Sequence, residues 1–163
     1  MSAHTDNSIL IDGPMDIVWD MTNDVESWPQ LFSEYQSVQI LRRDGDTVRF
    51  RLALHPDENG KVWSWVSDRT PDAATRTCRS MRVETGPFKY MSLFWEYLQT
   101  ADGVVLRWVQ DFEMKPGMPL DDAGMAARIN HNSVVQLQRI KSQIEAAVRR
   151  RRDDPIQPVR VNP

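Results

Sequence analysis

The stretch Lys61-Val62-Trp63-Ser64-Trp65-Val66-Ser67-Asp68-Arg69 is the part of the sequence on which the fold and the candidate site both depend. Its alternation predicts a β-strand, and a strand sends alternate side chains to opposite faces. One face then carries Trp63, Trp65, Ser67 and Arg69. Two indoles beside a hydroxyl and a guanidinium are typical of a small-molecule pocket rather than of a plain core. The alternative, which the strand alone leaves open, is that this face lies outside and Arg69 is solvated.

Further strands are predicted on both sides of this stretch. Asp44-Gly45-Asp46 is a hairpin signal, and it lies between two strands. Turn residues, from Pro71 and Gly86 to Gly103, separate the strands that follow. The predicted strands are residues 8–12, 38–43, 47–55, 61–69, 74–83, 91–97 and 104–114. Short strands in such close succession favour a single antiparallel sheet.

Three helices complete the predicted elements. Two short ones follow the first strand, at residues 14–22 and 29–35, and helices of this length must lie on something to be stable. A long helix is predicted at about residues 120–150. Asp121 and Asp122 suit its N-terminus and the arginines at 149–152 suit its C-terminus, through the helix dipole. A docking patch is the alternative interpretation of that arginine run.

The long helix has polar residues in the middle of its apolar stripe. The stripe consists of Met125, Ile129, Ile140, Ile144 and Val148, and the polar residues in its gap are Asn132, Ser133 and Gln136. Their position predicts that this part of the helix faces a wet cavity. The alternative is that the stripe drifts to Val134, Val135 and Leu137.

The order of these elements predicts an α+β protein of the helix-grip type. In this fold a curved antiparallel sheet, of about seven strands here, wraps around one long C-terminal helix and leaves a cavity between them. Residues 1–152 are expected to form a single domain, and residues 153–163 to form a disordered tail.

Composition narrows the classes of function. A net charge of −3 gives no indication of nucleic-acid binding, and no apolar run approaches the roughly 20 residues of a membrane span. The start of the chain does not look like a signal peptide, and the single Cys78 fits a reducing cytosol, so a cytoplasmic protein is expected. Cys78 is interpreted as a buried spacer rather than a nucleophile. The histidines lack metal-ligand spacing, so no metal site is expected.

Several segments resemble a known family. They are PMDIVWDMTNDVESWP at residues 14–29, LFSEY at 31–35, the strand from Trp63 to Arg69, and residues 86–95. Over about residues 7–150 the chain resembles the monodomain aromatase/cyclases of bacterial aromatic polyketide synthesis, within the START/Bet v 1-like superfamily. The first motif indicates only the superfamily. The Trp-Ser-Arg strand with Tyr35 points to the polyketide cyclases, most of all to the tetracenomycin and spore-pigment group.

The resemblance implies an enzyme that acts on an unreduced poly-β-ketone chain. The chain is tethered through phosphopantetheine to an acyl carrier protein and comes from a minimal polyketide synthase. The enzyme folds it in the cavity, promotes an intramolecular aldol condensation, usually from C9 to C14 for the first ring, and dehydrates that ring to an aromatic one. No cofactor, nucleic acid or membrane is expected to take part.

Catalytic roles are expected for three residues. Arg69 polarises and orients a substrate oxygen, Tyr35 donates or relays a proton, and Ser67 holds the chain or a water. The residues expected to bind substrate are Trp28, Phe32, Trp63, Trp65, Arg82, Phe88, Met91, Trp95, Trp108, Asn132 and Gln136. The family's pocket asparagine on the long helix falls at Gln136, and this departure leaves the helix-side hydrogen bond and the length of the substrate chain open.

Two other classes of function stay open at this point. The same superfamily holds carriers of hydrophobic small molecules, such as lipids or quinones, and fold alone does not decide function. A carrier needs aromatic walls but not a buried arginine beside a serine and a tyrosine. The third class is an interaction module with a vestigial cavity.

Overall fold

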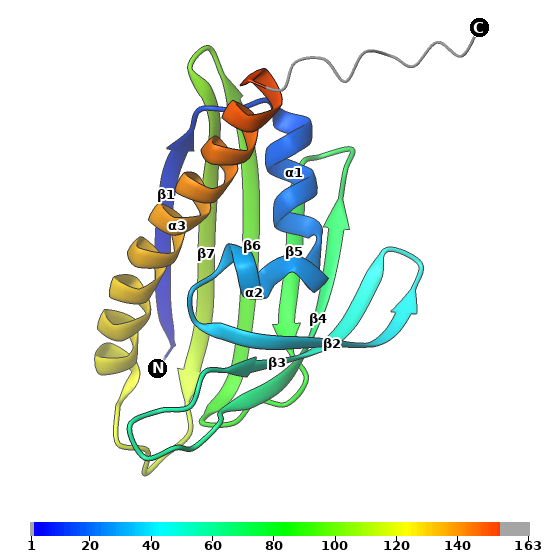
Figure 1. Ribbon diagram of the computed structural model, residues 1–163. Coiled ribbons are helices and arrows are strands. Elements are labelled where there is room, and N and C mark those ends of the chain that lie inside the picture. Colours follow the sequence, from blue (N-terminus) through cyan, green and yellow to red (C-terminus); the bar gives the residue numbers. More distant parts are fainter. Residues whose placement is uncertain (1, 154–163) are drawn as a thin grey trace, which may run out of the picture.

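The structure, a computed structural model, describes residues 2–153 and consists of one antiparallel sheet with helices on its concave side (Figure 1). The strands are β1 (Ala3–Ile11), β2 (Tyr35–Asp44), β3 (Thr47–Leu54), β4 (Ser64–Asp72), β5 (Thr77–Arg82), β6 (Phe88–Thr100) and β7 (Gly103–Met114). The helices are α1 (Met15–Asn23), the 3₁₀ turn η1 (Val25–Ser27), α2 (Trp28–Leu31) and α3 (Asp122–Asp153). The strand order is β1-β7-β6-β5-β4-β3-β2, so only β1 pairs out of sequence order.

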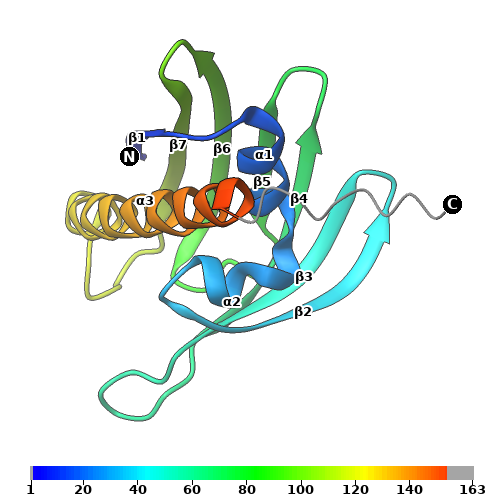
Figure 2. The ribbon, with the colours of Figure 1, turned by 45° about the horizontal axis from the view of Figure 1, so that its top comes forward.

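The sheet curves around the helices, as the turned view shows (Figure 2). The long helix α3 lies across β1 and β7, and α1 and α2 cover the strands in the middle of the sheet (Figures 1 and 2). Buried apolar residues of all these elements form the main core between sheet and helices. The helix-grip prediction is therefore confirmed, including the seven strands and the long C-terminal helix.

The start of the chain differs from the prediction in two ways. The first strand begins at Ala3 rather than at residue 8, because the polar residues before Ile9 pair in register with β7. The second short helix was expected at residues 29–35, but it begins at Trp28 and ends at Leu31. Trp28 adopts helical dihedrals in spite of the proline that follows it, since proline is tolerated in the first helical turn.

The later elements also differ at their ends. The strand β4 begins at Ser64 and continues through Pro71 to Asp72, where a turn had been expected. The tail was expected to begin at Asp153, but Asp153 is the last residue of α3. The rest of the expected tail, residues 154–163, lies outside the described residues. Over residues 2–153, no helix is long and apolar enough to span a membrane.

Candidate active site

Arg69 carries a buried positive charge in the middle of β4. The residue is 1% exposed, and its Cζ lies 5.1 Å from the centroid of the Trp28 ring and 5.0 Å from that of Trp95. Asn23 Oδ1 accepts hydrogen bonds from Nε at 3.3 Å and from Nη2 at 3.2 Å. Among residues 2–153, no carboxylate forms an ion pair with this guanidinium. A buried cation without a countercharge is costly, so its retention points to a ligand with negative charge.

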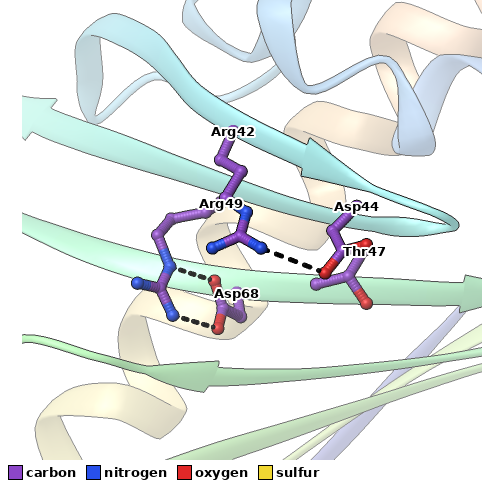
Figure 3. A pocket seen from close by; sticks show the side chains of 5 residues that line it. All are labelled: Arg42, Asp44, Thr47, Arg49 and Asp68. Atoms are coloured by element: carbon purple, nitrogen blue, oxygen red, sulfur yellow. Dashed lines mark hydrogen bonds and ion pairs between the residues drawn. The ribbon is translucent and has the colours of Figure 1, made fainter.

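The alternation of β4 places Arg69 inside, as predicted. Ser67 and Trp65 share its face, with Ser67 buried and Trp65 half-buried. Asp68 lies on the opposite, outer face, where its two oxygens accept from Arg49 Nε at 2.8 Å and Nη2 at 2.9 Å (Figure 3). The nearest acid in sequence is therefore turned away from Arg69 and neutralised by another arginine.

Trp63 was expected on the same inner face, and this prediction is wrong. Because β4 begins at Ser64, Trp63 belongs to the preceding loop and is 46% exposed. Its indole N–H donates to Asp57 Oδ2 at 2.9 Å, and Lys61 Nζ lies 3.7 Å from the ring centroid. These contacts with its own loop hold Trp63 at the surface.

Aromatic rings fill the space next to Arg69. They belong to Trp28, Phe32, Tyr35, Phe50, Trp95 and Trp108, which are all buried. Trp95 and Trp108 stack with centroids 4.8 Å apart, and Phe32 contacts Tyr35 at 4.9 Å and Trp28 at 5.0 Å. These aromatic contacts lie between the sheet and the helices, where a cavity was expected.

The hollows on the surface of the described residues include two that lie away from this cluster. One of about 100 Å³ is lined by Arg42, Asp44, Thr47, Arg49 and Asp68 (Figure 3). Both of its arginines are paired with an aspartate of the same hollow. The other, of about 180 Å³, is lined by Asp16, Ile17, Asp20, Met21, Ala147 and Arg151 of α1 and α3. Neither contains a residue that was predicted to bind substrate.

Tyr35 lies in the aromatic cluster beside charged groups. Burial raises the pKa of its phenol well above the ordinary value, and the negative charge of Glu34 adds to the rise. Burial also raises the pKa of the Glu34 carboxyl, which accepts from Asn132 Nδ2 at 3.1 Å. The guanidinium of Arg82 has its Cζ 4.0 Å from the Trp65 ring centroid, and burial lowers its pKa to about 10. Tyr35 therefore keeps its proton and can donate it, but it is a poor base.

The middle of α3 turns its polar residues inward. Ser133 and Gln136 are 1% and 2% exposed, whereas Val134 and Val135 are 57% and 45% exposed. Gln136 Nε2 donates to Ser33 Oγ at 2.8 Å, and Gln136 Oε1 accepts from the Ser33 backbone N–H at 3.0 Å. Ser133 and Gln136 therefore face inward, and the wet cavity expected beside them stays a prediction. Of the alternative stripe, Leu137 is buried and the two valines are exposed.

Phe88 and Met91 lie apart from the aromatic cluster. Both are buried in a second apolar group, with Phe112 and Met114, under the first turns of α3. Phe88 is linked to the predicted site through Arg82, whose Cζ is 4.8 Å from its ring centroid. The structure thus brings most of the predicted residues together around Arg69 but leaves Met91 at the edge.

Three polar residues near Arg69 and Tyr35 were missed from the sequence: Asn23, Glu34 and Tyr97. Asn23 gave no signal, because its partner Arg69 is 46 residues away. Glu34 stands beside the predicted Tyr35, and its half-buried position appears only in the fold. Tyr97 shares the inner face of β6 with Trp95, a periodicity that could have identified it.

Comparison with known proteins places this chain in a family. A family model described as polyketide cyclase/dehydrase and lipid transport matches residues 11–139. A candidate polyketide cyclase from Streptomyces cyaneus is 58% identical over 145 residues, which are 89% of this chain and 95% of that protein. Another, from Streptomyces halstedii, is 61% identical over 109 residues, which are 67% of this chain and 100% of that protein.

A solved structure extends the comparison to the fold. The Zhui aromatase/cyclase from Streptomyces sp. R1128 superposes with a TM-score of 0.81 at 22% sequence identity. The match covers 91% of this chain and 96% of the Zhui chain. The two proteins therefore share the helix-grip architecture over nearly their whole length.

Proposed function

Because this chain belongs to the polyketide cyclase/dehydrase and lipid transport family, we propose that it is a polyketide aromatase/cyclase. Its substrate is an unreduced poly-β-ketone chain tethered to an acyl carrier protein of a minimal polyketide synthase. It folds this chain in its interior, joins C9 to C14 in an aldol condensation and dehydrates the new ring to an aromatic one. The observation that carries the proposal is the buried guanidinium of Arg69, which pairs with no carboxylate of residues 2–153.

The aldol step needs a cation more than it needs a strong base. The protons between two ketones are acidic, so the enol of the chain forms readily. Its carbon attacks a second carbonyl carbon, a C–C bond forms, and the electron pair of the C=O bond moves to oxygen. Arg69 stabilises the negative charge that develops there, in a site from which the aromatic rings exclude water. Ser67, one pleat away on the same face, positions the chain or a water.

Dehydration needs a proton for the departing hydroxyl group. The hydroxyl leaves as water while the neighbouring carbon loses a proton, and enolisation of the remaining ketones makes the ring aromatic. We assign the donation to Tyr35 because its phenol carries a proton and lies in the aromatic cluster; its raised pKa makes it a weak acid, so the proton moves as negative charge develops on the leaving oxygen. Arg69 holds the oxygen near it, and its own pKa is too high for direct proton donation.

The aromatic cluster supports the proposed control of ring position. The rings of Trp28, Trp95 and Trp108 give flat apolar walls that hold a folded chain in few conformations. Admission of the chain requires these side chains to separate. The α2–β2 segment carries Trp28, Phe32 and Tyr35 and contacts α3 through α2, so its movement opens the cluster most directly.

A carrier of a hydrophobic small molecule is the second candidate. The description of the family includes lipid transport, and the interior of this chain is mainly aromatic and apolar. A carrier gains nothing from an unneutralised guanidinium in that interior, which is why the cyclase is preferred.

One reconstitution experiment distinguishes the cyclase from the carrier. A minimal polyketide synthase with a carrier protein is incubated with and without the purified chain, and the products are profiled by liquid chromatography and mass spectrometry. The cyclase predicts that the chain shifts the products from spontaneous shunt products to one correctly cyclised aromatic compound. An unchanged product profile would instead favour the carrier.

A further inference from the structure

The side-chain amide of Asn23 is fixed in one orientation at the end of α1. Asn23 Nδ2 donates to the backbone carbonyl of Trp19 at 2.9 Å, one turn earlier in the helix. The amide oxygen therefore faces the other way, toward Nε and Nη2 of Arg69 at 3.3 and 3.2 Å. This network assigns the oxygen and the nitrogen of the amide without ambiguity.

The phenol oxygen of Tyr97 is a second neutral oxygen near the guanidinium of Arg69. The Thr22 hydroxyl has one proton, which it donates to the Val18 carbonyl at 2.8 Å. In the 2.5 Å contact between Thr22 Oγ1 and Tyr97 Oη, the phenol must then be the donor. The lone pairs of the phenol oxygen are then available to accept from Arg69, and the charge of Arg69 opposes the rise that burial causes in the pKa of Tyr97.

The partners of Arg69 are neutral, whereas arginines on the surface pair with carboxylates. Arg49 pairs with Asp68, Arg51 with Glu84, and Arg107 with Asp6. A carboxylate at position 23 would make stronger, charge-assisted hydrogen bonds to a guanidinium than an amide does. It would also cancel the positive potential that the proposed reaction uses. An amide positions the guanidinium and leaves its charge available.

From this arrangement we propose that Asn23 is a positioning residue that holds Arg69 while leaving its charge unneutralised. The inference rests on the proposed function, because it assigns a purpose to that free charge. It implies that, for activity, the lack of charge on the Asn23 amide matters as much as the hydrogen bonds that the amide accepts from Arg69. An isosteric change that keeps the acceptor oxygen but adds a charge must then abolish the activity without harming the fold.

The variant Asn23→Asp makes this change. The change also replaces the N–H that binds the Trp19 carbonyl by a carboxylate oxygen, and the new ion pair with Arg69 offsets this loss, so we expect the variant to stay folded. We expect its rate of correct cyclisation in the reconstituted system to fall by about 10²-fold or more. Asn130→Asp is the matched control, because the exposed Asn130 also accepts a side-chain hydrogen bond through its amide oxygen, from Asn7. The control should cyclise at the wild-type rate. Wild-type cyclisation by a folded Asn23→Asp protein would overturn the inference.

A binding measurement separates the inference from the proposed function. Naphthoate and naphthamide have the same shape and differ in charge, and their binding is measured through quenching of tryptophan fluorescence. We expect the wild type to prefer naphthoate and Asn23→Asp to lose this preference. If the wild type prefers naphthoate but never alters the products, the proposed function fails while the role of Asn23 stands. Equal preference for naphthoate in wild type and variant contradicts the role of Asn23 itself.

Discussion

Gln136 of α3 and Ser33, an exposed residue between α2 and β2, are joined by two hydrogen bonds, one with the serine hydroxyl and one with its backbone N–H. They join α3 to the segment that carries the proposed proton donor Tyr35. Asn132 and Arg139 add bonds from the same helix to Glu34 and to the carbonyl of Gln30. Asn132 and Gln136 therefore anchor the α2–β2 segment, whereas Ser133 accepts from Gln110 Nε2 on β7 at 3.0 Å, and these partners explain why polar residues interrupt the apolar stripe.

Replacement of Gln136 by leucine tests this anchor. Gln136→Leu keeps the size of the side chain but leaves the Ser33 N–H without its acceptor. We expect the free energy of unfolding in urea to fall by about 1–3 kcal/mol. Amide hydrogen exchange should accelerate at residues 32–35. Gln138→Leu, at an exposed position of the same helix, is the control and should leave the exchange at 32–35 unchanged. Equal protection in the two variants would show that Gln136 does not anchor the segment.

Burial of Glu34 predicts a pH-dependent change in stability. The folded pKa of Glu34 is raised above the ordinary value of 4.5, chiefly by burial. Its contribution to stability is therefore fully present below about pH 4.5 and is lost as the pH rises through the folded pKa. We expect Glu34→Gln to be more stable than wild type at pH 7, with the difference shrinking toward pH 4. Urea denaturation at both pH values measures it, with the exposed Glu58→Gln as the control. A difference that grows on acidification contradicts the raised pKa.

Tyr35→Phe tests the proposed proton donor. A positioned acid contributes roughly 10²–10⁴-fold to a rate, and a water near Arg69 can replace part of this. We expect the rate of aromatic product formation to fall by at most about 10²-fold, with cyclised but undehydrated product accumulating. Mass spectrometry detects that product by its additional water. Tyr90→Phe, on the outer face of β6 and 38% exposed, serves as the control. Normal dehydration by Tyr35→Phe would remove the phenol from the mechanism.

The inner face of β4 was predictable because alternation is a local property of a strand. Trp65, Ser67 and Arg69 lie where the period of two placed them. Trp63 fits the same pattern and still lies outside, because the end of a strand depends on competing contacts, here the bond to Asp57 in the loop. Such contacts decide where a strand ends, and the alternation of residues does not reveal them.

The partner of Arg69 could not be predicted from the sequence. Asn23 meets Arg69 only because α1 packs on the concave face of the sheet, and no local pattern marks that meeting. For the long helix α3, the sequence predicted which residues face inward but not their hydrogen-bond partners. The polarity of Ser133 and Gln136 suggested an inward polar face, but the serine that binds Gln136 is 103 residues away.

Replacement of Arg69 is the most direct test of the central claim. Arg69→Ala, and Arg69→Met to keep the packing of the aromatic cluster, are compared with wild type in the reconstituted minimal synthase. Circular dichroism is recorded on the same samples. Removal of a buried charge that has no countercharge should leave the protein folded. Arg49→Ala, which breaks only an ion pair on the outer face of the sheet, is the control.

The account predicts that both Arg69 variants are folded and lose correct first-ring cyclisation by about 10²–10³-fold, as expected when a charge stabilising the developing oxyanion is removed. The products should revert to those of the synthase alone, while Arg49→Ala keeps the wild-type profile. A folded Arg69→Met protein that still gives the correct aromatic product at the wild-type rate would contradict the account.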